Sequence, residues 1–297
     1  MSTTTLDDRS RTPSTRLSAI LTRRAARLHW GQVVAHIILI IVALITLLPM
    51  VWCVFASFKH FKELVSSADL LPQVWTLDSY KAVFGLGSLW TGFRNTAIVT
   101  SSVTAAAVFT STLEGYVFAK FDFPGRNILF TILLATMMVP FFVVLLPLYL
   151  IVSGFGMTDH LTGLIVPGLF SAFGIFLIRQ FMFNVPNELI ESGRIDGASE
   201  ARIFAQIVVP LARSPMAALG ILTFLGVWND FVWPQVVLTT QDRQTLPIVI
   251  NGLQGLYWQN YDYLITAAVV SVVPLMIAYI FGSRYMIQGI AMTGLKM

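Results

Sequence analysis

The charged side chains that could do chemistry in this chain are concentrated in one stretch, residues 184–214. This stretch carries four acidic and three basic residues: Glu188, Glu191, Asp196 and Glu200, with Arg194, Arg202 and Arg213. Apolar residues such as Ile190, Ile195 and Ile203 recur among these charges. Such a mixture is typical of amphipathic helices, which bind a partner through an apolar ridge. The chemistry predicted here is therefore docking rather than bond breaking.

Residue types that support catalysis or metal binding are scattered along the chain. Four histidines (His29, His36, His60 and His160) lie far apart, and Cys53 is the single cysteine, so neither a metal-ligand spacing nor an intrachain disulfide arises. The GxSxG and HExxH motifs are absent, as is the glycine-rich loop ending in Gly-Lys that cradles nucleotide phosphates. We therefore expect no catalytic residue, no metal site and no cofactor in this chain, and energy for its work must come from another protein.

Long stretches without Asp, Glu, Lys or Arg surround the charged segment. Of the 297 residues, 56% are hydrophobic and only 11% are charged, about half the charged share of a soluble domain. The uncharged stretches are residues 33–58, 95–113, 127–158, 161–178, 214–229 (extended by 231–238) and 263–283. A helix that spans a bilayer needs about 20 mainly apolar residues. The sequence therefore predicts an all-α integral membrane protein with six transmembrane helices.

Lys and Arg residues predict the orientation, because they are enriched in cytoplasmic loops. With the N-terminus in the cytoplasm, 14 of the 19 Lys and Arg residues fall on the cytoplasmic side. We therefore expect both termini in the cytoplasm, with residues 1–30 as a mobile tail and residues 31–297 as the six-span domain. Anionic lipid headgroups account for the net charge of +4, so membrane lipid is an expected partner and nucleic acid is not.

The charged stretch itself is predicted to fold as two short helices on the cytoplasmic surface. Asn187 is a suitable N-cap, and this start places Glu188 and Glu191 in the first turn, where the helix dipole favours acidic side chains. Gly197 is expected to interrupt the helix, because glycine is the usual residue at such breaks. A second helix is expected over residues 198–208, before a proline opens the next segment.

Two kinds of partner are open to such a helix pair. An amphipathic helix on a membrane protein lies on the lipid surface or inserts its apolar ridge into a partner protein. Helices that bind lipid usually have a polar face rich in Lys and Arg. The excess of acid over base in this stretch therefore favours a protein partner.

The spacing of residues within this stretch resembles a known motif. Glu191-Ser192-Gly193 is followed after three residues by Gly197 and, after nine more, by Ile207-Val208-Val209-Pro210. This resembles the EAA loop, with the pattern EAA-x3-G-x9-I-x-L-P, of permease subunits in binding-protein-dependent ABC importers. Ser192 and Gly193 stand where the family has alanine, and Val209 stands where it has leucine. These replacements are small for small and apolar for apolar, and they leave the spacing intact.

The resemblance extends over about residues 30–297 and is strongest to the carbohydrate-uptake branch, including the second maltose permease subunit. Family-like segments are WTLDSY at 75–80, FPGRNILFTILLATMMVP at 123–140, FGIFLIRQF at 173–181, ELIESGRIDGASEARIF at 188–204 and WNDFVWP at 228–234. Glu114 departs from the family, in which alanine is usual at this position. A polar contact near the end of its helix and a role in proton relay are both open for this carboxyl.

The resemblance implies the type I ABC importer architecture in the cell membrane of a prokaryote. Two permease subunits, expected to be different chains, form the pathway, and an extracytoplasmic sugar-binding protein delivers the substrate. Two cytoplasmic ATPase subunits bind ATP and magnesium, and residues 184–214 form the cytoplasmic coupling loop that contacts one of them. The likeness assigns this ATPase-coupling role to Glu191, Ser192, Gly193, Arg194, Ile195, Asp196, Gly197, Ala198, Ile203 and Pro210.

Individual roles follow from position in the motif. Glu191 is expected to cap or salt-bridge the coupling helix, and Gly197 is expected to permit the turn. Arg194 and Asp196 either fix the loop to its own spans or reach the partner. The apolar ridge is expected to contain Ile195, Ala198 and Ile203.

The expected residues of the pathway or outer gate lie toward the outer side. Asn229 and Asp230 follow the fifth span, and Gly252 and Gly255 lie in the last outer loop, which the resemblance directs toward the binding protein. For Asp230, a hydrogen-bonding role at a helix end is equally compatible with the sequence. The expected function is the permease subunit of an ATP-driven importer of mono- or oligosaccharides, working by alternating access. The alternative is an autonomous ion-coupled secondary carrier or channel, which would transport without an ATPase.

Overall fold

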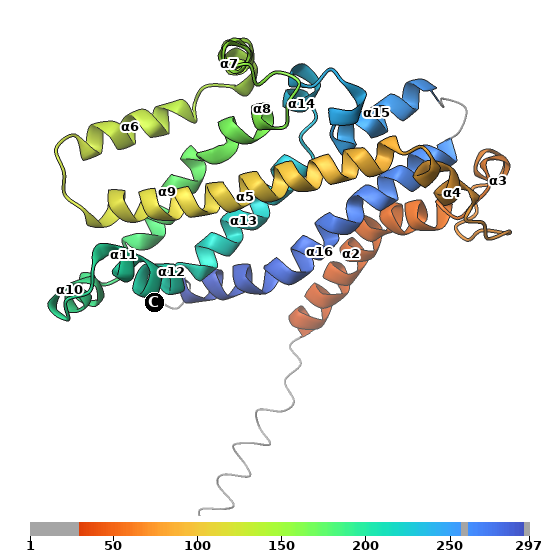
Figure 1. Ribbon diagram of the computed structural model, residues 1–297. Helices are drawn as coiled ribbons and strands as arrows, with labels where there is room; N and C mark the ends of the chain where they lie inside the picture. The colour runs from red at the N-terminus through yellow and green to blue at the C-terminus, as the bar shows by residue number, and fades with distance from the viewer. Residues whose placement is uncertain (1–29, 257–260, 294–297) are drawn as a thin grey trace, which may run out of the picture. The chain divides into compact units, whose positions relative to one another are not determined.

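The computed structural model describes residues 30–256 and 261–293, and within them it contains helices and turns but no strand (Figure 1). The chain divides into two compact units, one ending at Trp52 and the other beginning at Cys53. The tail predicted over residues 1–30 lies outside the described residues except for Trp30. The all-α class expected from the sequence is confirmed.

The described part of the first unit is helix α2 (Trp30–Ala56), whose last turn belongs to the second unit. An 18-residue window within this helix has a mean hydropathy of 3.0, and none of that window is buried inside the chain. A helix that is apolar on every face is stable where lipid or another apolar helix surrounds it. Helix α2 therefore has the character of a membrane span.

Helix α5 (Ser88–Lys120) is the central element of the second unit. It packs against α9 (Ala172–Met182), α13 (Arg213–Trp228) and α15 (Leu246–Leu256). Its buried polar side chains are Asn95, Thr96, Thr100, Ser111 and Thr112. Polar groups inside a membrane are stable where they face other helices rather than lipid. The polar residues of α5 therefore explain why this span lies inside the bundle.

Small residues let α5 and α9 approach closely. A Cβ atom added at Gly115 of α5 would lie 2.8 Å from the side chain of Ile178 on α9. A Cβ atom added at Gly174 of α9 would collide with the side chain of Ser111 on α5. Membrane helices associate largely through such close backbone contacts, so these two glycines fix the α5–α9 pair.

Two further spans have the positions expected from the sequence. Helix α16 (Tyr261–Thr293) packs against α13 and against the short helix α4 (Asp78–Gly85). Helix α8 (Thr162–Ile165) and the 3₁₀ turn η1 (Val166–Leu169) lead into α9, and residues 162–182 together are long and apolar enough to cross a membrane.

The two remaining spans are bent rather than straight. Helices α6 (Arg126–Thr136) and α7 (Phe141–Gly154) meet at 104°, so the stretch expected over residues 127–158 does not form one straight helix. Pro140 precedes α7 and cannot donate the backbone hydrogen bond that would continue α6. Residues 200–211 meet α13 at 76°. The described residues hold four candidate spans, and six if each bent pair counts as one span, which is the number expected from the sequence.

Short helices connect the spans. Three of them are α3 (Phe61–Ser66), α14 (Val232–Val237) and the 3₁₀ turn η3 (Gln241–Arg243). Between α9 and α13 lie α10 (Asn187–Ile195), α11 (Glu200–Ile203), the π-helix η2 (Phe204–Val208) and α12 (Val209–Leu211). The second group forms the charged stretch identified in the sequence.

Candidate functional site

The turn between α10 and α11 is a standard helix ending built on glycine. Gly197 has a φ of +78°, in the left-handed region that favours glycine. The Gly197 amide donates to the carbonyl of Arg194, and the Ala198 amide donates to the carbonyl of Gly193, both at 3.0 Å. These two bonds form a Schellman motif, which satisfies the last carbonyls of α10. The break predicted at Gly197 is present, and its cause is backbone conformation, since a Cβ there would meet nothing within 4 Å.

An ion pair joins the two helices across this turn. Arg194 Nε donates to Glu200 Oε1 at 2.6 Å, and Tyr116 Oη of α5 donates to Glu200 Oε2 at 3.3 Å. The Arg194 guanidinium also lies over the ring of Phe121, 5.5 Å from its centroid. The hydrogen bond to Glu200 raises the pKa of Arg194 above its ordinary value. One carboxylate therefore connects α10, α11 and α5.

The beginning of the loop is tied to the same central helix. Lys120 Nζ, at the end of α5, donates to the Val185 carbonyl at 2.6 Å and to Asn187 Oδ1 at 2.7 Å. Both partners lie where α9 leads into α10. The loop is thus attached to α5 at its beginning through Lys120 and near its middle through Tyr116.

The apolar residues of the loop divide into a buried set and an exposed set. Ile190, Ile203 and Val208 are buried in a core with residues of α5, α9 and α13 and of the connections beside them: Tyr116, Ile178, Met182, Val185, Ala212 and Leu219. In contrast, the side chain of Ile195 is 85% exposed. Ile203 is fully buried by its own chain, so it supports the loop from inside and is not part of an exposed ridge. Ala198 is half-buried against the same core.

The exposed surface of the loop is formed by the residues next to the turn. Glu191, Ser192, Arg194, Ile195, Asp196 and Gly197 are all exposed. Gly193 is buried, and a Cβ there would lie 3.0 Å from the Ile207 side chain and 3.2 Å from that of Ile203. Glycine at this position therefore lets α10 lie directly on the helix that follows. The motif residues thus comprise an exposed group at the tip and a buried group beneath it.

Three details of the sequence interpretation are corrected by the structure. Helix α10 begins at Asn187 and follows Pro186, so Asn187 is the first helical residue and not the N-cap; its side chain accepts the bond from Lys120. Glu188 is in the first turn, whereas Glu191 lies beyond it. The second helix begins at Glu200, because Ser199 is its N-cap and its Oγ accepts from the Arg202 amide at 3.4 Å.

Pro210 does not open the segment that follows the loop. It lies inside α12, and the chain bends after it, near Ala212, before α13 starts at Arg213. Pro210 lies near the end of the continuous helical run 200–211, directly after the π-helix η2. Proline has no backbone N–H to donate to the preceding turn, and Pro210 lies where the charged loop leads into the fifth span.

The four residues expected in the pathway do not form one site. Asn229 lines a cavity of about 310 Å³ with Trp228, Pro247 and Asn251 among its walls. Asp230 lines a different cavity of about 220 Å³. Gly252 and Gly255 lie in α15, and Gly252 has open space where a Cβ would stand. The two cavities lie at the end of α5 that is opposite to the loop.

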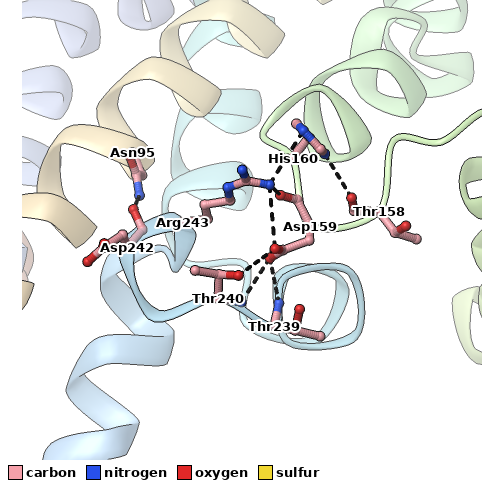
Figure 2. Close-up of polar contacts among 8 residues, drawn as sticks. All are labelled: Asn95, Thr158, Asp159, His160, Thr239, Thr240, Asp242 and Arg243. Carbon is pink, nitrogen blue, oxygen red and sulfur yellow. Dashed lines mark hydrogen bonds and ion pairs between the residues drawn. The ribbon is translucent and has the colours of Figure 1, made fainter.

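A polar cluster that the sequence analysis did not identify fastens two connecting segments together (Figure 2). Asp159 Oδ1 accepts from the Thr239 and Thr240 amides at 2.9 and 2.8 Å, and its Oδ2 accepts from Thr240 Oγ1 at 2.5 Å. Arg243 donates to the Asp159 carbonyl and lies 3.4 Å from Oδ2. These hydrogen bonds, first of all the one from the Thr240 hydroxyl, hold the pKa of Asp159 well below its usual range. We call this cluster the outer clasp, because the sequence analysis expects the loop that follows the fifth span to lie on the outer side.

The important residues that sequence reasoning missed are those whose partners lie far away in the chain. Glu200 was noted as a charge of the stretch, but its contact with Tyr116 spans 84 residues, and Asp159 bonds Thr240 across 81. Within the described ranges, no group of three or more His, Cys, Asp and Glu side chains could hold a metal ion.

The fold and the site define a class of protein. Several apolar helices surround one polar central helix, and an ordered helical loop between two spans presents charged and apolar residues next to a glycine turn. Such a molecule is a multi-pass membrane protein with an ordered, charged helical loop between two of its spans.

Comparison with known proteins identifies the family. Residues 111–291 match the family model described as "Binding-protein-dependent transport system inner membrane component". The chain belongs to this family, and it is therefore a transporter subunit of an ABC importer rather than an enzyme. The matched range includes the whole charged loop.

Relatives are similar along most of the chain. The arabinooligosaccharides transport system permease protein AraQ of Bacillus subtilis is 36% identical over 258 residues, which are 86% of this chain and 92% of the relative. The diacetylchitobiose uptake system permease protein NgcG of Streptomyces coelicolor is 33% identical over 250 residues, 83% of each chain. A crystal structure of a bacterial ABC transporter that imports alginate has the same fold, with a TM-score of 0.75 and 21% identity, over 94% of this chain and 99% of that one.

Proposed function

We propose that this chain is the permease subunit of an ATP-driven oligosaccharide importer and that residues 184–214 couple it to a cytoplasmic ATPase. The observation that carries the coupling role is the exposure of Ile195. Ile195 is 85% exposed beside the Gly197 turn, whereas Ile190 and Ile203 of the same loop are buried. An exposed apolar side chain at this place indicates a surface that a partner protein covers. Burial of such a side chain in a partner's groove contributes about 1.5–3 kcal/mol.

The proposed mechanism follows from how the loop is attached. A groove on the ATPase receives Ile195, and Glu191, Ser192 and Asp196 provide polar contacts around it. The Schellman turn and the Arg194–Glu200 pair keep the loop tip rigid. Because Glu200 and Lys120 connect the loop to α5, a displacement of the tip on ATP binding moves the central helix. Movement of α5 relative to its neighbours changes access to the pathway.

The proposed substrate class rests on the named relatives. Two of them, each at least 33% identical, are permease proteins for arabinooligosaccharides and for diacetylchitobiose. Both substrates are short chains of sugar units, so we propose an oligosaccharide as the cargo of this chain. Asn229, Asp230, Gly252 and Gly255 remain our proposal for pathway or outer-gate residues, because the first two line cavities at the end of α5 opposite to the loop.

The proposed partners complete an importer. They are two ATPase subunits that bind ATP and magnesium, a second permease subunit, membrane lipid and an extracytoplasmic sugar-binding protein. A crystal structure of an alginate transporter contains a substrate-bound periplasmic protein and has the same fold, with a TM-score of 0.61. The distribution of Lys and Arg supports cytoplasmic termini, with residues 1–30 as a tail and residues 31–297 as the permease domain.

Purification from the native membrane tests this proposal. The membrane is solubilised gently, the chain is isolated, and the proteins that remain bound are identified by mass spectrometry before ATP hydrolysis is measured. Recovery of an ABC ATPase and a second permease, with ATP hydrolysis, is the expected result. Recovery of the chain alone, able to move solute after reconstitution without ATP, would contradict the proposal and favour an autonomous carrier.

A further inference from the structure

The cavity that Asp230 lines has walls from several parts of the second unit. It has a volume of about 220 Å³, and its walls include Thr96 and Thr100 of α5, Trp233 of α14, and Thr245, which precedes α15. The remaining wall is mostly apolar. Binding sites for small molecules usually combine an apolar wall with a few polar groups that fix orientation, and this cavity has that composition.

Two hydroxyl groups in the cavity wall lack hydrogen-bond partners. Thr100 Oγ1 and Thr245 Oγ1 are buried and unpartnered among the described residues. Both residues are nearly inaccessible, with 0% and 3% of their surface exposed. A buried polar group without a partner is costly, and native proteins usually satisfy it. Since both hydroxyls line the same cavity, a ligand with hydroxyl groups could satisfy both.

Asp230 adds a third polar group to this wall. One of its carboxylate oxygens has a long contact of 3.5 Å with the Trp233 amide. A carboxylate accepts about four hydrogen bonds, so Asp230 retains capacity for donors inside the cavity. Trp233 itself is held in place, because its indole nitrogen donates to the Gly163 carbonyl at 3.2 Å. Trp233 is therefore a fixed part of the cavity wall that also contains Asp230.

The segment that contains Thr245 is fastened on both sides. Asn95 Nδ2 donates to the Asp242 and Gln244 carbonyls at 3.0 Å, and Thr96 Oγ1 accepts from the Leu246 amide at 2.7 Å. Figure 2 shows the Asn95 contact together with the outer clasp, which holds the beginning of the same segment through Asp159. Thr245 is thus positioned before any ligand arrives.

We propose that this cavity is a subsite of this chain for one sugar unit of the transported oligosaccharide. Thr100, Thr245 and Asp230 bind its hydroxyl groups, and Trp233 contacts an apolar face of the ring. A volume of about 220 Å³ is below the range of roughly 300–1,000 Å³ for sites that hold drug-sized molecules, so it suits one unit rather than a whole chain. This inference rests on the proposed function, because it assumes an oligosaccharide as cargo.

The test measures sugar binding by the complete importer in lipid nanodiscs, without the binding protein. Cellular uptake of a panel of tritiated oligosaccharides, including arabinotriose and diacetylchitobiose, first identifies the imported sugar, which then serves as the probe. Thr100→Val and Thr245→Val each remove one hydroxyl while keeping a similar shape. Thr104→Val is the matched control, because Thr104 Oγ1 is also buried and unpartnered in the described structure but does not line the cavity.

The expected result is saturable binding by the unmodified importer, weakened about tenfold by Thr100→Val and by Thr245→Val, and unchanged by Thr104→Val. Thermal unfolding of each variant serves as the check on folding. If all three variants bind the sugar as tightly as the unmodified importer, the subsite is overturned. Water would then be the partner of the Thr100 and Thr245 hydroxyls. Absence of saturable binding in an importer that still takes up the sugar would also overturn it, while leaving the proposed function intact. Uptake of no sugar of the panel would contradict the proposed function as well.

Discussion

Arg194 and Glu200 face each other across the Gly197 turn, with Arg194 Nε 2.6 Å from Glu200 Oε1. The second oxygen of the same carboxylate accepts from Tyr116 on the central helix α5. Glu200 therefore links the residues at the Gly197 turn to the central helix of the second unit, in addition to the contacts that Lys120 makes at the beginning of the loop. Any force that a partner applies to the tip has a direct route to α5.

Reversing the charges of this pair tests that route. Arg194→Glu or Glu200→Arg alone places like charges across the turn, and we expect each to lower uptake about two- to tenfold, which corresponds to the lower part of the coupling range of about 0.5–3 kcal/mol for residues in contact. Their side chains are 41% and 48% exposed, so the free energy of unfolding should change by less than about 1 kcal/mol. Transport assays on proteoliposomes and thermal unfolding measure the two effects separately.

The double variant Arg194→Glu, Glu200→Arg is the control for the charge pair. It should recover part of the lost uptake because the ion pair can form again in the opposite sense. Recovery should be incomplete, since a basic residue at the start of α11 opposes the helix dipole. If the double variant takes up sugar no better than either single variant, the Arg194–Glu200 ion pair does not determine uptake.

The backbone of Gly197 gives a second prediction. Proline there requires a φ near −65°, which is incompatible with the observed +78°, so Gly197→Pro should leave the protein inserted but uncouple ATP hydrolysis from uptake. Asparagine tolerates the left-handed region, and no neighbour lies within 4 Å of a Cβ at this position. Gly197→Asn should therefore retain most of the uptake. Normal uptake by the proline variant would refute the role of the turn.

Two isoleucines of the same loop should respond in opposite ways. Ile195→Ser changes an exposed side chain, so it should leave the free energy of unfolding within about 0.5 kcal/mol but weaken ATPase binding about tenfold or more. Ile203→Ala removes atoms from a fully buried position and should lower stability by about 2–5 kcal/mol. Thermal unfolding and co-purification of the ATPase distinguish these effects. A strongly destabilised Ile195→Ser would contradict the division into exposed and buried sets.

The outer clasp should persist in acid. Because its hydrogen bonds lower the pKa of Asp159 from the ordinary value of 3.8, the carboxylate contributes stability above pH 3.8, and this stability is lost only as the pH falls through the lowered pKa. Hydrogen exchange reports it directly, since the Thr239 and Thr240 amides donate to this carboxylate. We expect equal protection factors for these amides at pH 7 and pH 4.

Asp159→Ala is the variant that checks this assignment. It removes both acceptor oxygens, so protection of the Thr239 and Thr240 amides should fall at both pH values. A loss of protection in the unmodified protein between pH 7 and pH 4 would mean that another group fastens the segment.

Short stretches of the sequence were enough to predict most of the membrane spans and the turn at Gly197. Uncharged stretches predicted the spans because membrane helices must be apolar, and Gly197 marked the break because its conformation excludes most side chains. The sequence could not predict that Ile195 is exposed and Ile203 is buried, since both are isoleucines on a short amphipathic stretch. Which of them faces the core depends on α5, α9 and α13, which lie far away in the sequence.

Other features required the tertiary structure. The bend of 104° between α6 and α7 lies within an apolar run, and hydropathy alone did not reveal it. The Glu200–Tyr116 and Asp159–Thr240 contacts join residues more than 80 positions apart. The cavity beside Asp230 likewise has walls from several helices, so the sequence could name Asp230 as a pathway residue without placing Thr100 and Thr245 beside it.

Site-specific cross-linking from Ile195 tests the central claim, that this loop contacts the ATPase. A photoreactive amino acid replaces Ile195 in the full importer, and the matched control replaces Val65 of α3, which is 67% exposed. We predict that irradiation joins this chain to the ATPase polypeptide from position 195 and not from position 65. An assembled importer that gives no ATPase adduct from position 195 would contradict the account.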